Sequence, residues 1–356
     1  MEKVLILQEE ITRYRLPIFN LLAQKVDLTI GCLREPVWND DVSFKYILLK
    51  SKQYKGVYYI SNLLNCCNNF DVVFYMPHLR IVGYFMLPFF RHKFKTIAWT
   101  NGTRASYTQK FDLDRKMGFL DKIYFKNLRK ADAVVLYIEE ALKTVTRYGV
   151  KKERVFFAYN TVAVDYRGEA TQMKNSIMFI GTLYKGKGVE ELIRCYEKAY
   201  WKIKDKESFP TLDIVGAGTE LLFLQQLVKE LHLEQKIIFY GAIYDESVLS
   251  EMFQKAILCV SPNQAGLSVL KSLGYGVPFV TKVNAITGGE IVNVIDGYNG
   301  FLLKDTEDFV ELFVKVETEK HKFLVMGEYA RTFYETKVSP EIMVKGFVDA
   351  IDYVMK

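Results

Sequence analysis

The sequence has 356 residues, 50% hydrophobic and 25% charged, which are the proportions of soluble globular chains and exclude a disordered chain, a collagen-like fibre and a disulfide-stabilised peptide. Its length exceeds what one hydrophobic core usually serves and predicts two domains. The net charge of +6 is unevenly distributed, because residues 1–165 carry 26 basic and 16 acidic side chains and residues 166–356 carry 22 and 26.

Short apolar runs alternate with amphipathic stretches in the first part of the chain. The runs predict buried strands at Val4–Leu7, Leu28–Cys32, Val72–Tyr75, Thr96–Thr100 and Ala133–Tyr137. Helical spacing predicts helices at Leu16–Gln24, Tyr58–Asn65 and Met117–Arg129. The first run is too short for a secretory signal, and the longest uncharged apolar stretch, Ile81–Phe90, is about half of a membrane-spanning helix. We therefore expect a cytoplasmic protein without a spanning helix.

The alternation is clearer in the second part of the chain. Strands are predicted at Ser176–Ile180, Thr211–Val215, Lys236–Tyr240, Ile257–Val260 and Pro278–Thr281. Helices are predicted at Val189–Tyr200, Thr219–Leu231, Glu246–Gln254 and Leu267–Tyr275. This pattern predicts an α/β protein with two Rossmann-like, parallel-sheet domains, residues 1–165 and 166–338, joined at the polar stretch Asp165–Asn175. Ser339 followed by Pro340 predicts the start of a final helix, residues 339–356, expected to pack on the first domain.

Loops beyond the carboxyl ends of parallel strands are where ligands bind in such sheets. The loop Gly181–Gly188 places three glycines with Lys185 and Lys187 between a strand and a helix, which suits a phosphate. A tight turn with two solvated lysines is the alternative. The loop Ala265–Ser268 enters a helix and is a second candidate anion site, or an ordinary helix cap.

Other motifs point away from cofactors and metals. Gly216-Ala217-Gly218 lacks the third glycine of a dinucleotide fingerprint, so a nicotinamide-dependent oxidoreductase is the least favoured function. Asp112 and Asp114 resemble a metal-binding pair but have no carboxylate cluster nearby, so a helix cap or a partner for neighbouring lysines is expected. The five cysteines show no paired spacing and the four histidines are far apart, so we expect no metal site.

Several loops, taken in order, resemble retaining glycosyltransferases of family 4, which have the GT-B fold. The segments that carry the resemblance in the second part are 181–183, 187–189, 212–218, 238–241, 260–262, Gly266-Leu267, 276–278 and 296–300. Weaker matches in the first part are Tyr14-Arg15-Leu16-Pro17, Trp99-Thr100-Asn101-Gly102 and Tyr159-Asn160-Thr161. The resemblance implies two domains that face each other across a cleft, with a nucleotide sugar on the second and the acceptor on the first.

The same resemblance implies roles for individual residues. Lys187 neutralises the donor diphosphate in place of a metal ion, so no cofactor is implied, and Asn101 and Glu290 are further catalytic candidates. The implied donor-binding residues are Gly181, Thr182, Lys185, Lys187, Gly216, Gly218, Gly241, Ala242, Gln264, Ala265, Gly266, Leu267, Ser268 and Lys271. The implied acceptor-side residues are Tyr14, Arg15, Asn101, Gly102 and Arg104.

The chain also departs from the family pattern. Thr182 stands where an arginine is usual, Lys271 stands where the second of two glutamates is usual, and a short loop at 262–266 deletes the first glutamate. Glu290 is the candidate replacement. Asn101 stands in place of a histidine and can hydrogen-bond a sugar hydroxyl, although it cannot carry a proton at neutral pH. The alternative function is therefore a GT-B-shaped binding or scaffold protein that has lost catalysis.

The short loop resembles a sub-branch from bacterial surface-polysaccharide assembly, such as capsule or O-antigen synthesis. The expected function is then retaining, metal-independent transfer of a sugar to a lipid-linked saccharide.

Basic and apolar side chains in the first part predict peripheral attachment to the anionic inner face of the membrane. The apolar stretch Ile81–Phe90 is followed by Arg91, Lys93 and Lys95, and a second basic, amphipathic stretch contains Lys116, Lys122 and Lys126. A buried core with a solvated basic face is the alternative. Nucleic acid is not expected as a partner, because no surface for reading bases is evident.

Overall fold

The computed structural model describes residues 1–104, 111–114, 116–168 and 174–356, which form two compact units. Unit 1 consists of Met1–Ala163 together with Ser339–Lys356, and unit 2 consists of Val164–Val338. The predicted boundary at 165/166 differs from this division by two residues. Part of the predicted linker, residues 169–173, and Arg115 of the second basic stretch lie outside the described residues.

Unit 1 is built on a parallel sheet of seven strands in the order β3-β2-β1-β6-β7-β8-β9. The strands are β1 (Lys3–Leu7), β2 (Asp27–Cys32), β3 (Lys45–Leu48), β6 (Val72–Tyr75), β7 (Lys95–Thr100), β8 (Ala133–Leu136) and β9 (Val155–Phe157). The central strands are buried on both faces, which explains their nearly uninterrupted apolar sequences. All five strands predicted for this part are confirmed.

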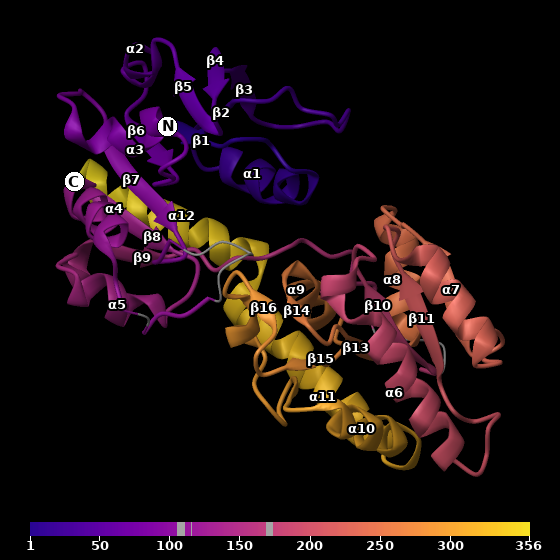
Figure 1. Cartoon of the computed structure of the whole chain (residues 1–356). Helices are drawn as coiled ribbons and strands as arrows, with labels where there is room; N and C mark the ends of the chain where they lie inside the picture. Colours follow the sequence, from indigo (N-terminus) through magenta and orange to yellow (C-terminus); the bar gives the residue numbers. More distant parts are fainter. Residues whose placement is uncertain (105–110, 115, 169–173) are drawn as a thin grey trace. The chain divides into compact units, whose positions relative to one another are not determined.

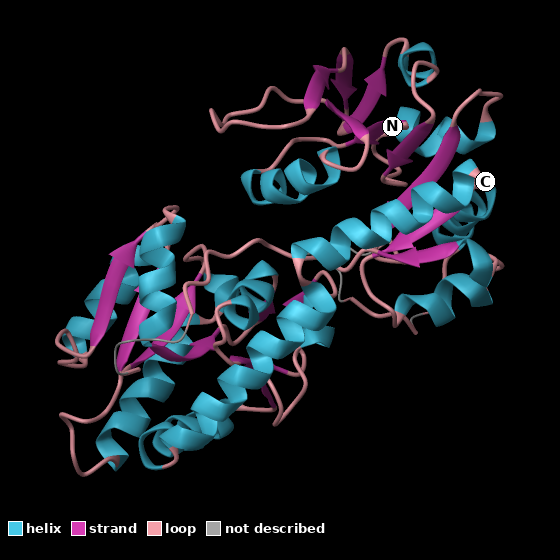
Figure 2. Cartoon of the chain, turned by 180° about the vertical axis from the view of Figure 1, so that it is seen from behind, coloured by secondary structure: helices cyan, strands magenta, loops and turns pink. Residues whose placement is uncertain are grey.

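Helices cover both faces of the first sheet (Figures 1 and 2). They are η1 (Arg13–Arg15), α1 (Leu16–Ala23), α2 (Leu63–Cys67), α3 (Val82–Met86), η2 (Leu87–Phe89), α4 (Phe119–Lys130), α5 (Ala141–Arg147) and η3 (Lys152–Arg154). On one face, the hydroxyl of Tyr75 donates to Oδ1 of Asn127 in α4 at 2.9 Å. This buried hydrogen bond holds α4 against β6.

The C-terminal helix α12 (Pro340–Met355) belongs to unit 1 and packs against α1, β8 and β9. Figure 1 shows it in yellow along the sheet of this unit. Phe347 meets the rings of Phe74 and Trp99 edge to face, with ring centroids 5.4 and 4.9 Å apart. Ser339 and Pro340 occupy the predicted N-cap and first positions, although no side-chain capping hydrogen bond forms.

One predicted helix is wrong. Residues 58–65 were expected to be helical, but β4 (Ser51–Tyr54) and β5 (Val57–Ile60) form an antiparallel hairpin, and α2 begins only at Leu63. The turn residues Lys55 and Gly56 both have positive φ, +46° and +78°, which is the geometry of a two-residue hairpin turn. The apolar spacing after the turn fits a helix as well as it fits a strand, so the turn residues were the more reliable signal.

Unit 2 is built on a parallel sheet of six strands in the order β12-β11-β10-β13-β15-β17. They are β10 (Ser176–Ile180), β11 (Thr211–Val215), β12 (Ile237–Gly241), β13 (Ala256–Val260), β15 (Phe279–Lys282) and β17 (Gly300–Leu303). A separate two-stranded pair, β14 (Gln264–Ala265) with β16 (Ile286–Thr287), runs parallel beside it. The five predicted strands are confirmed, whereas the short pair and β17 were not predicted.

The helices of unit 2 are η4 (Lys185–Lys187), α6 (Val189–Lys202), α7 (Leu221–Glu230), α8 (Glu246–Lys255), α9 (Leu267–Gly274), η5 (Glu290–Asn293), α10 (Thr306–Thr318), α11 (Lys320–Phe333) and η6 (Tyr334–Val338). The helix α10 packs on α6 around buried Phe309 and Phe313. Two Rossmann-like units with parallel sheets, and a C-terminal helix on the first, confirm the predicted GT-B-like fold class.

The apolar stretch at 81–90 is largely part of the core of unit 1. Tyr84, Phe85 and Leu87 are buried, and the hydroxyl of Tyr84 donates to the carbonyl oxygen of Gln8 at 2.9 Å. Val82 is 37% exposed, and Phe90 at the end of the stretch is 51% exposed. Most apolar side chains of this stretch thus pack inside the unit, and Nδ2 of Asn127 in α4 donates to the carbonyl oxygen of Phe85, while membrane attachment stays a prediction. Within the described residues, none of the helices combines the length and apolar character needed to traverse a bilayer.

Candidate functional site

Three loops at the carboxyl ends of β10, β11 and β12 are held together through glycine backbones. The N–H of Gly181 donates to the carbonyl oxygen of Val215 at 3.0 Å. The N–H of Gly216 donates to the carbonyl oxygen of Gly241 at 2.7 Å. A Cβ atom at Gly216 would lie 1.9 Å from the carbonyl oxygen of Gly181, and one at Gly218 would lie 2.2 Å from that of Leu183. No other residue fits these positions, so the glycines bring the loops close enough to form one surface.

Lys187 lies at the end of η4 with its ammonium group against Gly181. A Cβ atom at Gly181 would be 3.5 Å from Nζ of Lys187. The ammonium group forms no hydrogen bond or ion pair with any residue in the described part of the chain, and burial lowers its pKa. Lys185 and Thr182 are more exposed at the same edge. A desolvated cation without a counter-charge, beside free backbone at a strand end, is suited to hold an anion.

The loop after β13 closes on the same region. A Cβ atom at Gly188, where φ is +75°, would lie 2.5 Å from the amide nitrogen of Asn263. The hydroxyl of Tyr184 donates to Oε1 of Gln264 at 2.5 Å. Pairing of β14 with β16 then fixes Ala265 opposite Thr287. The structure therefore brings the two anion-binding loops predicted from the sequence into contact.

Helix α9 begins directly after this loop with an open N-terminus. Gly266 is the N-cap, no side chain caps the first turn, and a Cβ atom at Gly266 would meet nothing within 4 Å. The backbone N–H groups of Leu267 and Ser268 lie in that first turn, where helical N–H groups have no partner within the helix. These positions can donate to an oxyanion, as predicted. Ala242 is exposed after Gly241, at the end of β12.

Two predicted donor-site residues are engaged with other protein groups. The ammonium group of Lys271 donates to Oε1 of Glu246 at 2.6 Å, and the hydroxyl of Tyr275 donates to Oε2 of the same glutamate at 3.1 Å. Glu290 is buried, and its Oε2 accepts from the N–H of Gly288 at 2.9 Å. The roles predicted for Lys271 and Glu290 thus stay predictions. The pairing of Glu246 with Lys271 was not predicted from the sequence. The opposite charges of the two residues are the sequence feature that could have indicated it.

In unit 1, the acceptor-side residues gather around Trp99. The guanidinium carbon of Arg15 lies 4.4 Å from the Trp99 ring centroid, and Nη2 donates to the hydroxyl of Tyr137 at 3.2 Å. Tyr14 also faces this guanidinium group, at 5.2 Å. Gly102, with φ of +84°, turns the chain where a Cβ atom would lie 2.4 Å from Cβ of Ala141.

A pocket of about 350 Å³ lies beside this cluster, at the ends of β6, β7 and β8. Asn101 and Arg104 line it, and Oδ1 of Asn101 accepts from the N–H of Thr103 at 3.3 Å. Nη1 of Arg104 lies 3.5 Å from Oδ1 of Asp121. The structure therefore brings four of the predicted acceptor-side residues, Arg15, Asn101, Gly102 and Arg104, to one end of the sheet.

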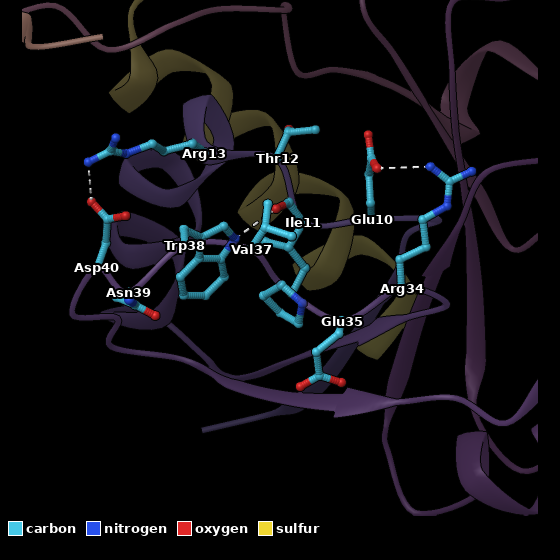
Figure 3. A pocket seen from close by; sticks show the side chains of 11 residues that line it. Glu10, Ile11, Thr12, Arg13, Arg34, Glu35, Val37, Trp38, Asn39 and Asp40 are labelled. Carbon is cyan, nitrogen blue, oxygen red and sulfur yellow. Dashed lines mark hydrogen bonds and ion pairs between the residues drawn. The ribbon is translucent and has the colours of Figure 1, made fainter.

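A groove of about 860 Å³ at the ends of β1 and β2 was not predicted (Figure 3). Trp38 lies in its floor and donates from Nε1 to the carbonyl oxygen of Ile11 at 2.8 Å. Charged pairs stand at either end: Arg13 with Asp40 at 3.0 Å, and Arg34 with Glu10 at 3.2 Å. The sequence signal was a tryptophan near one proline, Pro36, and several charged residues in a loop, which apolar periodicity does not detect.

The acidic pair Asp112 and Asp114 lies in a loop and, among the described residues, neither caps a helix nor pairs with a lysine, although the sequence predicts one of these roles. The N–H of Asp114 donates to Oδ1 of Asp112 at 2.9 Å, and Arg147 lies 3.9 Å from Asp114. Among the residues placed by the structure, no group of three or more His, Cys, Asp or Glu side chains is arranged to hold a metal ion.

The fold defines the class: a GT-B-like protein whose second unit has glycine loops and a lysine that are suited to hold an anion. Residues 167–333, nearly all of unit 2, match the family model of glycosyl transferases group 1, in agreement with the predicted class.

Curated proteins of similar sequence and solved structures of similar fold both agree with this class. The chain is similar to the N-acetyl-alpha-D-glucosaminyl L-malate synthase of Bacillus anthracis, 26% identical over 56% of this chain and 51% of that protein. It spans about half to 60% of the length of the curated relatives it matches. Among solved structures, HepE of Anabaena in complex with UDP has a TM-score of 0.74 at 13% identity, covering 98% of this chain and 99% of that one. A lipopolysaccharide outer core galactosyltransferase, WaaB, has a TM-score of 0.66 at 17% identity, covering 98% and 99%.

Proposed function

We propose that this protein is a retaining glycosyltransferase that takes a sugar from a UDP-sugar, binding the donor on unit 2 and the acceptor on unit 1. The observation that carries the proposal is the unpaired, desolvated ammonium group of Lys187 among the glycine loops of a group 1 domain. HepE, which shares the fold, was solved with UDP and with UDP-glucose, which supports uracil as the base.

The proposed chemistry follows from where the charges lie. When the bond between the sugar carbon and the diphosphate breaks, negative charge gathers on the departing phosphate oxygens. Lys187 supplies a full positive charge to these oxygens, and the N–H groups at the start of α9 donate hydrogen bonds. Because a cation and backbone donors stabilise the leaving group, we propose that the transfer needs no metal ion.

We further propose that the acceptor is a saccharide seated along the groove at Trp38. An indole ring can stack on the apolar face of a sugar, and carboxylate and guanidinium groups at the groove ends can bond its hydroxyls. The name of WaaB, a lipopolysaccharide galactosyltransferase, supports a lipid-linked saccharide of the bacterial surface.

A basic face of α4 supports attachment of the enzyme to an anionic membrane. Lys122 and Lys126 are exposed on one side of this helix, Lys116 precedes it, and Phe119 is 75% exposed at its start. The helix also contacts η2, beyond which the exposed side chains of Arg91, Lys93 and Lys95 follow. Each lysine near an anionic surface contributes about 1 kcal/mol, so these cations are enough for salt-sensitive binding.

Vesicle flotation tests the membrane part. The full chain should float with vesicles that contain anionic lipid, and less so as salt increases. Changing Lys116, Lys122 and Lys126 to Glu should abolish flotation. As the control, changing Lys25, Lys143 and Lys151 to Glu should weaken flotation only slightly. Both triple variants change the net charge equally, so a difference between them reports the position of the lysines. Equal losses in the two variants would contradict a specific membrane face.

Two measurements on the full chain test the transferase itself. UDP should raise the melting temperature more than UMP, CDP or NAD, and release of UDP from a UDP-sugar should continue in EDTA. UDP binding without any turnover across a panel of saccharide acceptors would favour the catalytically inactive binding protein. Absence of any nucleotide response would overturn the proposed donor site.

A further inference from the structure

A pocket of about 740 Å³ lies in unit 2 between β17, α10 and α11. The strand order places β17 at one edge of the sheet and β12 at the other. None of the described residues that line the pocket belongs to the glycine loops or to α9. Its volume lies within the roughly 300–1,000 Å³ typical of small-molecule sites, so the pocket can hold a ligand of its own.

Two tyrosines form an aromatic surface in this pocket. The rings of Tyr298 and Tyr329 are stacked, with centroids 4.8 Å apart and planes 8° from parallel, and they remain 39% and 44% exposed. The turn that carries Tyr298 is held by Asn299, which is fully buried. Nδ2 of Asn299 donates to the carbonyl oxygen of Asn293 at 2.9 Å, and its Oδ1 accepts from the N–H of Ile295 at 2.7 Å. The ring surface is therefore formed before any ligand arrives.

Charged side chains recur along the wall that α10 contributes. They stand three or four residues apart and so share one side of the helix: Asp308, Glu311, Lys315 and Glu319. The carboxylate of Asp308 accepts from backbone N–H groups before α10, and that of Glu319 pairs with Lys322 at 2.8 Å. The side chains of Glu311 and Lys315 form no hydrogen bond or ion pair with any described residue, so both are available to a ligand.

The pocket is better suited to a small ligand than to another protein chain. The outward-facing groups of β17 are occupied, because the N–H of Leu302 donates to Oδ1 of Asp296 and the carbonyl oxygen of Gly300 accepts from Gly297, both at 2.9 Å. A further strand therefore has no free edge to join there. Among the described lining residues, the exposed large apolar side chains are the two tyrosines alone, whereas a standard protein interface buries about 800 Å² per partner.

We propose that this pocket binds a saccharide chain, as a second site apart from the donor loops. The tyrosine rings pack against the apolar face of a sugar ring, Glu311 accepts hydrogen bonds from hydroxyls, and Lys315 and His321 donate to them. Three carboxylates line the pocket with two ammonium groups and one imidazole, which favours a neutral ligand over a strongly charged one. The inference rests on the proposed transferase function, because a chain held here stays with the enzyme between transfers and raises the local concentration of acceptor ends.

Nuclear magnetic resonance of the histidine rings tests the site directly. The chain has four histidines, of which His321 lines this pocket, and a His321→Gln variant assigns its signal. With UDP present to occupy the donor site, maltohexaose, chitotetraose and xylohexaose are titrated in turn. At least one of them should shift the His321 signal, whereas sorbitol, which has no ring face, should not. Trp38→Ala should show the same shift, because its groove lies in unit 1.

Ring-removal variants complete the test. Tyr298→Ala and Tyr329→Ala should each weaken oligosaccharide binding about tenfold, and Tyr329→Phe, which keeps the ring, should bind as the wild type does. Trp201→Ala, which removes an exposed ring of unit 2 outside the pocket, should also bind normally. No shift of His321 with any of the oligosaccharides, or full binding by both alanine variants, overturns the site.

Two further outcomes separate this site from its alternatives. A dimer in sedimentation that both alanine variants abolish, without saccharide binding, assigns the tyrosines to a second copy of the chain and overturns the proposal. Oligosaccharide binding in a chain that ignores UDP keeps the pocket and rejects the transferase. Sugar transfer by a chain whose His321 signal never shifts keeps the transferase and rejects the pocket.

Discussion

Lys187→Met removes the ammonium group and keeps the length of the side chain. In the structure this group lies beside Gly181, desolvated and without a partner among the described residues, so the variant breaks no contact within the protein. The melting temperature without ligand should therefore be unchanged or slightly higher. A hydrogen bond to a charged group contributes about 1.5–3 kcal/mol, which predicts UDP binding weaker by about 10- to 150-fold.

Transfer should suffer more than binding, because negative charge on the diphosphate grows as its bond to the sugar breaks. Loss of one such stabilising group costs about 100- to 1,000-fold in rate. The assay measures UDP release and UDP-induced melting shifts in parallel, and Lys198→Met removes an exposed charge from α6 as the control. Wild-type UDP affinity and rate in Lys187→Met would refute the reasoning, whereas a large loss in Lys198→Met would show a general charge effect.

The same ammonium group predicts a pH dependence. Burial lowers the pKa of Lys187, so its positive charge is lost at a lower pH than that of an exposed lysine. UDP affinity should therefore fall as the pH becomes alkaline, since the neutral amine no longer attracts the diphosphate. Lys187→Met should bind UDP weakly at every pH. A fall of equal size in this variant would assign the pH dependence to another group.

Four further changes test other parts of the structure. Gly216→Ala places a methyl group 1.9 Å from the carbonyl oxygen of Gly181, at a residue whose φ is +152°. In a denaturant titration it should lower the unfolding free energy of unit 2 by about 3–5 kcal/mol. The control Gly297→Ala, where φ is +71° and no atom lies near the new methyl group, should lower it by about 1–2 kcal/mol. Gly346→Ala, whose Cβ would lie 1.8 Å from the carbonyl oxygen of Phe157, should loosen α12 and lower the melting temperature, whereas Glu341→Ala on the exposed side of the helix should not. Trp38→Ala should raise the acceptor KM about tenfold without changing UDP binding, and an equal effect of Tyr54→Ala outside the groove would contradict a role for the indole ring. The difference in unfolding free energy between the wild type and Lys174→Met should rise with pH from about 8, the lowered pKa of Lys174, toward 10.5, because this lysine binds more protons in the unfolded chain over that range.

The parallel sheets could be predicted from the sequence because buried strands leave uninterrupted apolar runs. Val72–Tyr75 and Ser176–Ile180 show this plainly, and each is followed by a polar loop. Exposed or short strands give no such signal. The edge strand β3 has exposed side chains, and β14 and β16 have two residues each, so neither apolar runs nor alternation could reveal them. The hairpin at 51–60 shows that turn geometry can override helical spacing.

The close approach of the glycine loops could be predicted because it depends on backbone and glycine, which the sequence displays directly. Gly216 and Gly218 leave no room for a side chain in the structure, and Gly181 has a φ of +155°, which is why they stand out as a pattern. Contacts between side chains far apart in sequence could not be predicted in the same way. The pairing of Lys271 with Glu246 and the burial of Glu290 depend on how α8, α9 and η5 pack together.

A lowered lysine pKa does not by itself mark a ligand site, and unit 2 contains the comparison that shows why. Lys174 is buried with a pKa of about 8, yet its ammonium group donates to the carbonyl oxygen of Ala256 at 2.9 Å and so already has a partner. It also stands at the opposite end of the sheet, before β10, where the amino ends of parallel strands rarely bind ligands. The ammonium group of Lys187 is also desolvated, but it donates to no carbonyl oxygen among the described residues. Lys187 lies at the carboxyl ends of the strands. Among the described residues, the absence of a protein partner at that edge, rather than the pKa shift, is what supports the proposed role of Lys187 at the diphosphate.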